Sequence, residues 1–316
     1  MTSLQPSLSA EARAFLAEPP PPPPPVDYSD PAAVREWRIR FTETWGAAMR
    51  FARVPVSVER IELGGVGCLR VDPSAGPRPG PPILHFHGGA YVLGAAKASL
   101  PISAAIAQRT GLRVVSVDYR LAPEHRFSAA LDDAVAVYRS ICAAEGAPAA
   151  VVGESAGGGL ALSTAVRARD AGLPLPGSLA LLAPFIDLTG SRKLDPALVE
   201  FDPWVDDPRT GLYAAAAAYA PGAAAGDPGA SPLFADLAML PPTLIQVGDR
   251  DVLVEEARLL ADRLRSAGVE VTLDVWGGLW HAWQMFQDVP EALAALDGVA
   301  GFLITQLRRD AIPSSS

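Results

Sequence analysis

The stretch AAVVGESAGGGLALSTAVRARDA, residues 149–171, decides the fold class. Its first residues, Ala149–Val152, predict a short buried strand, and Gly158–Ala171 predict a helix. Between them lies GESAG (153–157), with a glycine two residues to each side of Ser155. A strand, a sharp turn and a helix in this order are typical of a nucleophile elbow, in which glycines permit the strained turn and expose the serine hydroxyl. A simple turn of small residues is the alternative interpretation.

Short apolar runs on both sides of this stretch predict further strands. They are Ile83–His87, Val114–Val117, Leu179–Leu182, Thr243–Val247 and Val269–Val275, with helical patterns such as Leu160–Ala171 and Glu255–Ala267 between several of them. Alternating strands and helices predict an α/β fold with a mainly parallel sheet, helices on both faces, and functional loops at the carboxyl ends of the strands. The segment Val54–Val71, interrupted by Gly64 and Gly65, predicts a hairpin at the sheet edge.

Two segments do not follow this alternation. Asp30 and Pro31 predict a helix start, followed by Val34, Trp37, Phe41 and Trp45 at helical spacing. This apolar stripe either packs on the domain core or forms a lid over an apolar pocket. The segment Leu188–Asp227 is interpreted as an inserted helical excursion.

Composition excludes several classes of partner. The 316 residues are 49% hydrophobic, a length and composition that permit one large domain or two smaller ones, and 35 acidic against 26 basic residues give a net charge of -9. Nucleic acid and anionic membranes require clustered Lys and Arg, so we expect neither as a partner. Cys68 and Cys142 are too few for a disulfide framework or a thiolate metal site. With no signal-peptide pattern and no run approaching the ~20 apolar residues that span a bilayer, a cytoplasmic protein is expected.

A serine nucleophile needs a general base, and the chain has four histidines. His85 falls inside a predicted strand, His87 begins a glycine loop, and His125 lies in a turn where a structural hydrogen bond is the simpler role. His281 follows the predicted strand Val269–Val275 through two glycines, at a strand-end loop. We therefore predict His281 as the base.

The base in turn needs a carboxylate that fixes its tautomer. Asp249 and Asp251 both follow the strand Thr243–Val247. Asp251 is favoured, while Asp249 could instead hold the turn or pair with Arg250. The order Ser155, Asp251, His281 is that of the α/β hydrolases.

A glycine-containing loop, HGGA at His87–Ala90, follows the predicted strand Ile83–His87. Such a loop can direct backbone amides outward and predicts an oxyanion hole formed by the amides of Gly89, Ala90 and Ala156. A generic glycine turn is the alternative.

Together, these motifs resemble the bacterial hormone-sensitive-lipase-like, or family IV, esterases. The matching stretches are HGGA (87–90), DYRLAPEH (118–125), GESAGG (153–158), SPLFADL (231–237), GDRDVL (248–253) and His281. The resemblance runs from about Ile83 to the C-terminal helix. It implies an α/β-hydrolase fold as a single domain over residues 1–316, with a helical cap from residues 1–50 and 188–227, and it implies that two copies can pair as a homodimer.

The sequence departs from the family pattern at two positions. Ala90 stands where a third glycine is usual, and Glu154 stands where aspartate is usual. Ala90 retains its N–H, so we expect an oxyanion hole, with less room beside the acyl carbonyl. The tail from Val275 to Trp283 is most similar to a branch that includes lactone hydrolases.

These residues predict a serine carboxyl-ester hydrolase that acts on short-chain acyl esters through an acyl-enzyme, with no metal or organic cofactor and a small ester or lactone as its substrate. Lactone hydrolysis is the main alternative. A non-catalytic small-molecule receptor and an amidase are the rival classes, since one fold supports several functions. Trp280 and Trp283, which flank the predicted base, are expected to crowd the site and favour small substrates.

Overall fold

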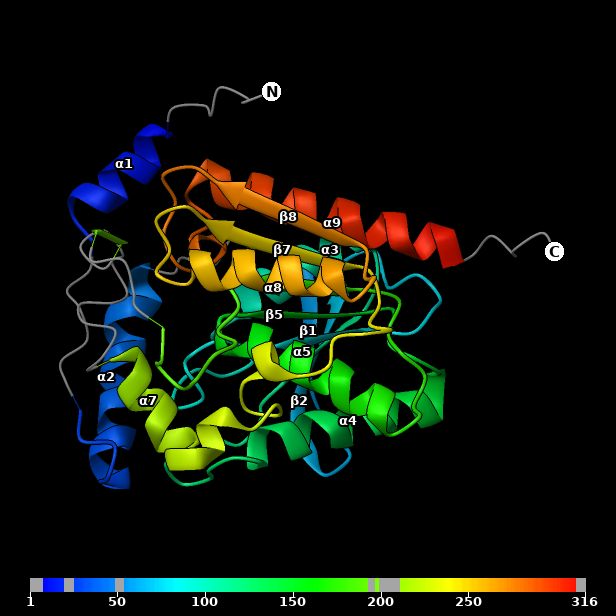
Figure 1. Cartoon of the computed structure of the whole chain (residues 1–316). Coiled ribbons are helices and arrows are strands. Elements are labelled where there is room, and N and C mark those ends of the chain that lie inside the picture. The colour runs from blue at the N-terminus through cyan, green and yellow to red at the C-terminus, as the bar shows by residue number, and fades with distance from the viewer. Residues whose placement is uncertain (1–7, 20–25, 49–53, 193–196, 199–210, 311–316) are drawn as a thin grey trace.

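The computed structural model describes residues 8–19, 26–48, 54–192, 197–198 and 211–310, and the side chains of residues 41–48 and of Asp310 lie outside this description. In these residues eight strands form one sheet in the order β1-β2-β4-β3-β5-β6-β7-β8 (Figure 1). The strands are β1 (Val56–Leu63), β2 (Val66–Pro73), β3 (Ile83–Phe86), β4 (Val114–Val117), β5 (Ala150–Glu154), β6 (Leu179–Leu182), β7 (Thr243–Gly248) and β8 (Val271–Trp276).

The sheet is parallel from β4 to β8, and the antiparallel hairpin of β1 and β2 extends it beyond β4. Gly64 and Gly65 make the hairpin turn with φ values of 58° and 80°, a conformation that favours glycine. The predicted hairpin and its place at the sheet edge are therefore confirmed.

Helices cover both faces of the sheet. The described α-helices are α1 (Ala10–Ala17), α2 (Pro31–Ala48), α3 (Leu100–Thr110), α4 (Ala129–Glu145), α5 (Ala156–Asp170), α7 (Leu212–Tyr219), α8 (Val254–Ser266) and α9 (Pro290–Asp310). The short 3₁₀ helices are η1 (Gly222–Gly226), η2 (Pro232–Phe234) and η3 (Trp283–Met285). One core cluster joins the sheet to α4, α5 and α8, and a second joins it to α3 and α9. The central strands are buried on both faces, which explains their continuous apolar sequences and confirms the α/β-hydrolase fold class.

The elbow segment differs from its predicted boundaries. Strand β5 continues to Glu154, and helix α5 begins at Ala156, two residues before the predicted start at Gly158. Glycines are poor helix formers, but here they are required for close packing. A Cβ at Gly157 would lie 2.1 Å from the Phe86 carbonyl oxygen, and one at Gly159 would lie 2.1 Å from the Phe185 carbonyl oxygen. Packing thus overrides helix propensity in this turn.

Strand β8 also begins later than predicted, at Val271 rather than Val269. Gly268 has a φ of 82°, and the amide of Val269 donates to the carbonyl of Leu264. These residues close the C-terminus of α8 before the strand can start.

The N-terminal helices contact different parts of the domain. On α1, Phe15 stacks on Trp280 with ring centroids 4.5 Å apart. The side chain of Asp30 accepts from the amide of Ala32 at 2.8 Å, which confirms the predicted start of α2. Val34 and Trp37 are buried, so this part of the apolar stripe packs on the core, whereas the side chains of Phe41 and Trp45 lie outside the described residues.

The described part of the segment Leu188–Asp227 contains α7 and η1, as expected of a helical insertion. Tyr219 at the end of α7 stacks on Tyr91 with centroids 4.1 Å apart. In Figure 1, α2 and α7 lie toward the same end of the molecule.

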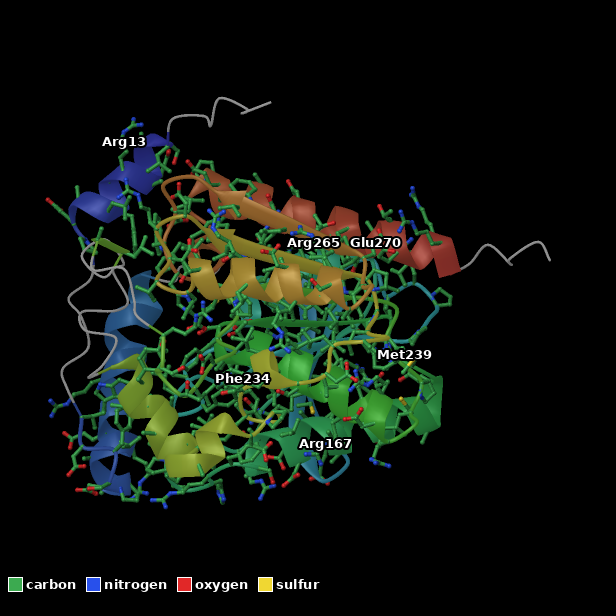
Figure 2. The ribbon with its side chains drawn as sticks, in the orientation of Figure 1. Arg13, Arg167, Phe234, Met239, Arg265 and Glu270 are labelled. Atoms are coloured by element: carbon green, nitrogen blue, oxygen red, sulfur yellow. The ribbon has the colours of Figure 1, made fainter. Side chains whose placement is uncertain are left out.

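Exposed apolar side chains include Phe234 and Met239, on the segment that leads into β7 (Figure 2). Cys68 is buried and Cys142 is half-buried. Of the helices in the described ranges, none combines the length and the apolar character that a membrane span requires.

Candidate active site

Ser155 occupies the sharp turn between β5 and α5. Its φ of 54° and ψ of -121° are strained for a residue with a side chain. Gly153 and Gly157 make the turn possible, because a Cβ at Gly153 would lie 2.1 Å from the Gly157 carbonyl oxygen. The amide of Ser155 donates to the Leu182 carbonyl at 2.8 Å, which ties the turn to β6. The predicted elbow geometry is therefore present.

His281 lies beside this serine. Its Nε2 is 2.8 Å from Ser155 Oγ, a hydrogen-bond distance, although the two residues are 126 positions apart in the chain. The imidazole is almost fully buried. Of the four histidines, the one predicted as base is the one that the fold brings to the serine.

Asp251 contacts the other side of the His281 ring. Nδ1 of His281 lies 3.1 and 3.0 Å from the two carboxylate oxygens of Asp251, which is fully buried. The amide of Leu253 also donates to this carboxylate at 2.8 Å. A carboxylate can only accept, so Nδ1 carries the imidazole proton and Nε2 is left as the acceptor that faces the serine hydroxyl.

Asp249 has a different position. Its Oδ1 accepts from the amide of Gly278 at 2.6 Å, and its own amide donates to the Trp276 carbonyl at 2.9 Å. The amide of Arg250 donates to the Leu279 carbonyl at 3.1 Å. These bonds join the loop after β7 to the loop that carries His281, so Asp249 holds the turn, as the alternative interpretation of this residue proposed.

The loop after β3 lies against the nucleophile. A Cβ at Gly88 would be 3.2 Å from the Cβ of Ser155. Gly89 and Ala90 have φ values of 114° and 50°. Among the described residues, the amides of Gly89, Ala90 and Ala156 donate to no other protein group. The three predicted oxyanion donors are therefore free for a ligand at the carboxyl ends of β3 and β5.

The carbonyl of each of these three peptide units is held by hydrogen bonds. His87 Nδ1 donates to the Gly88 carbonyl at 2.7 Å, and the amides of Val92 and Leu93 donate to the Gly89 carbonyl at 3.0 and 2.9 Å. The Ser155 carbonyl accepts from the amides of Gly158, Gly159 and Phe185. A trans peptide is planar, with its N–H opposite its C=O, so anchoring these carbonyls fixes the directions of the Gly89, Ala90 and Ala156 amides.

His87 serves this loop as a neutral side chain. Burial lowers the pKa of its imidazole, although the Gly88 carbonyl acts in the opposite direction. Its ring stacks on Tyr119 with centroids 4.1 Å apart, and the Tyr119 hydroxyl donates to the His87 carbonyl at 2.7 Å. Sequence reasoning assigned no contact to Tyr119, although its position in DYRLAPEH could have drawn attention to it.

Glu256, at the start of α8, is a second residue that sequence reasoning missed. Burial, together with the nearby Asp187 and Asp251 carboxylates, raises the pKa of Glu256 to about 8. Its Oε1 contacts the Tyr213 hydroxyl at 3.3 Å. The raised pKa favours the uncharged form of Glu256, which limits the negative charge around Asp251. In the sequence, the one indication of this role is that Glu256 lies five residues after Asp251, at the start of a helix.

Trp280 and Trp283 do not take the positions expected for them. Both are fully buried in the core cluster shared with α3 and α9, where Trp280 packs on Phe15 and Phe286 and Trp283 packs on Trp276. A side chain without exposed surface cannot contact a substrate, so the prediction that these two tryptophans crowd the site is wrong.

A serine, a buried aspartate and a histidine in this chain order, on a mainly parallel sheet with an elbow after a central strand, define a serine hydrolase of the α/β-hydrolase fold. A sequence profile described as alpha/beta hydrolase fold matches residues 83–285 of the chain.

Comparison with known proteins agrees. The chain is 36% identical over 233 residues to an acetyl-hydrolase of Streptomyces hygroscopicus, a match covering 71% of this chain and 75% of that protein. It is 34% identical over 231 residues to an esterase of Acinetobacter venetianus, covering 70% of this chain and 73% of the relative. The crystal structure of an esterase from the bacterial hormone-sensitive lipase family superimposes with a TM-score of 0.84 at 33% identity, over 95% of this chain and 99% of that one.

The chain therefore belongs to the hormone-sensitive-lipase-like esterases of the α/β-hydrolase fold, and its activity is the hydrolysis of carboxyl esters. The resemblance predicted from the motifs is confirmed at the level of the family.

Proposed function

We propose that Ser155 attacks the carbonyl carbon of a short-chain ester, with His281 as general base and Asp251 as the group that orients it. The observation that carries the proposal is the continuous contact from Ser155 Oγ to His281 Nε2 at 2.8 Å and from His281 Nδ1 to the Asp251 carboxylate at 3.0 Å. A hydroxyl is a weak nucleophile at neutral pH and requires a base at this distance.

The reaction proceeds in two acyl transfers. As Oγ bonds to the carbonyl carbon, its proton moves to Nε2 of His281, and the imidazolium then donates that proton to the departing alcohol as the ester C–O bond breaks. Water attacks the resulting acyl-serine, His281 again accepts a proton, and the acid leaves as Oγ is protonated. The Asp251 carboxylate stays ionised and stabilises the imidazolium in both steps.

The negative charge that develops on the carbonyl oxygen is stabilised by the amides of Gly89, Ala90 and Ala156. Their fixed directions support this role, because donors that need no reorganisation stabilise a transition state most effectively. Ala90 fulfils it despite its methyl group, since its φ of 50° preserves the loop conformation of a glycine at some cost in strain.

Short acyl groups are the proposed substrates. The acetyl-hydrolase at 36% identity supports this class. Residues 1–50 and 188–227 are proposed as the cap that bounds the acyl site, and the stacking of Tyr219 on Tyr91, the residue after Ala90, supports this assignment. Each methylene that meets a wall instead of a pocket forgoes about 0.8 kcal/mol of burial, which limits the useful chain length.

The cytoplasm is the proposed location. The two cysteines are free thiols, which supports a reducing compartment.

A substrate series tests the proposed class. We expect p-nitrophenyl acetate and butyrate to be hydrolysed much faster than the palmitate ester, with a burst of p-nitrophenol equal to the enzyme concentration where deacylation is slower than acylation. Faster turnover of palmitate would contradict the short-chain proposal. A small lactone belongs in the same series, and its faster hydrolysis would move the preferred substrate from open-chain esters to lactones.

A further inference from the structure

Glu154 precedes the nucleophile and has no role in the two acyl transfers described above, yet its carboxylate is fully buried beside the active site. Its Oε1 accepts from the amide of Gly88 at 2.8 Å and from the hydroxyl of Ser99. Its Oε2 accepts from Nε2 of His85 at 2.9 Å. One side chain therefore connects β5 to β3, to the start of α3 and to the oxyanion loop.

The groups around this carboxylate favour its charged form. Burial would raise the pKa of Glu154, but the neighbouring His85, the Ser99 hydroxyl and the Gly88 amide together lower it below its ordinary value. His85 is itself held by Ser116, whose Oγ lies 2.9 Å from Nδ1. A charged acceptor with three donors is a strong and directional anchor.

The contact with Gly88 matters because of its position in the loop. The amide of Gly88 belongs to the peptide unit directly before the one that carries the Gly89 amide, and the His87 side chain anchors the carbonyl of that next unit. The backbone at Gly88 is thus held on both sides. The backbone at Gly88 is also closely packed, because a Cβ at this position would lie 3.1 Å from the Glu154 carbonyl oxygen and 3.2 Å from the Ser155 Cβ.

We propose that Glu154 is a positioning residue of the oxyanion hole, which holds the Gly88 amide so that the Gly89 and Ala90 amides point at the reacting carbonyl. This inference rests on the proposed acyl transfer from Ser155. It also gives a reason for glutamate at this position: an aspartate on the same backbone is one methylene shorter and cannot keep all of these contacts.

Two substitutions of Glu154 distinguish the loss of its charge from the loss of its hydrogen-bond acceptor. Glu154→Gln retains an oxygen that accepts from Gly88 and Ser99, and its amide can donate to His85 once that ring takes its other tautomer. Glu154→Ala removes the acceptor. We expect Glu154→Gln to keep kcat within about 5-fold of wild type, and Glu154→Ala to lower kcat about 10- to 100-fold with little change in KM, less than the loss of a whole oxyanion donor.

A matched control accounts for lost stability. Asp72 is a nearly buried carboxylate paired with Arg113, at the far end of the strands from the site. Asp72→Ala should lower the melting temperature while leaving kcat within 2-fold, because kcat per folded molecule depends on the loop and not on global stability.

The direct readout is the inhibition constant of an alkyl boronic acid, which forms a tetrahedral adduct with Ser155 and places an oxygen among the oxyanion donors. We expect Glu154→Ala to weaken boronic acid binding by about the factor by which it lowers kcat, and Asp72→Ala to leave it unchanged. A folded Glu154→Ala enzyme with wild-type kcat and boronic acid affinity would overturn the inference, as would equal losses in Glu154→Gln and Glu154→Ala. Failure of the underlying acyl-transfer proposal is distinguishable, since wild type would then be insensitive to the boronic acid.

Discussion

Ser155 has a strained backbone conformation. A non-glycine residue with a φ of 54° costs about 1–3 kcal/mol. The cost is offset locally, because the Ser155 amide donates to Leu182 and its carbonyl accepts from three amides. Those same bonds direct the Ala156 amide outward, so the strain and the proposed oxyanion hole have a common origin.

Asp251 and Asp249 provide the sharpest test at the scale of single residues. Asp251→Asn should lower kcat by about 10³- to 10⁴-fold, because an amide no longer favours the tautomer in which Nε2 accepts the serine proton. Asp249→Asn keeps an oxygen for the Gly278 amide and should lose about 10-fold at most.

Steady-state kinetics of the two purified variants, with their melting temperatures as controls, decides between the two acids. Equal losses, or a larger loss in Asp249→Asn, would show that the orienting acid is assigned to the wrong residue.

At the scale of elements, sequence patterns predicted the features that local chemistry determines. The strands of the parallel sheet follow from apolar runs, and the elbow follows from the glycines two residues to each side of Ser155. The histidine follows from its place after a predicted strand and from simpler roles for the other three histidines. The contacts of Glu154 and Glu256, by contrast, join residues far apart in the chain, and their burial depends on neighbouring elements. The prediction that Trp280 lines the active site was wrong for the same reason, because its stacking partner, Phe15, comes from the distant helix α1.

Helix α2 is attached to the domain through Arg38. Its guanidinium donates to the carbonyls of Val92 and Ala122, and it forms a two-pronged pair with Glu124. Val92 follows the oxyanion loop by two residues, so this attachment links the proposed cap to the site. We expect Arg38→Ala to destabilise the protein by about 1–3 kcal/mol, since it removes partly buried, charge-assisted hydrogen bonds, and to weaken the preference for short esters.

Arg40→Ala is the matched control, because Arg40 pairs with Glu36 on the exposed surface of the same helix. Exposed pairs of this kind contribute about 0–1 kcal/mol. Denaturant titrations and the substrate series measure both effects, and indistinguishable results for the two arginine variants would show that Arg38 does not attach the cap.

At the scale of the whole molecule, the sheet brings residues that are distant in sequence together at the carboxyl ends of its parallel strands. Strands β3, β5, β7 and β8 are parallel and end on the same side, so the loops that follow them deliver Gly89, Ser155, Asp251 and His281 together. The family and the triad order could be read from the sequence, whereas the hydrogen bonds that fix the oxyanion loop required the assembled fold.

The most direct measurement is the position of the acyl group on the enzyme. Wild-type enzyme and Ser155→Ala are mixed with p-nitrophenyl acetate, quenched in acid within the first turnover, digested and mapped by mass spectrometry. We predict one acetyl group on Ser155 in the wild type, none in the folded Ser155→Ala variant, and a kcat reduced by about 10⁴- to 10⁶-fold in that variant. An acetyl group on another residue, or a folded Ser155→Ala enzyme that keeps more than a few per cent of wild-type kcat, would contradict Ser155 as the nucleophile.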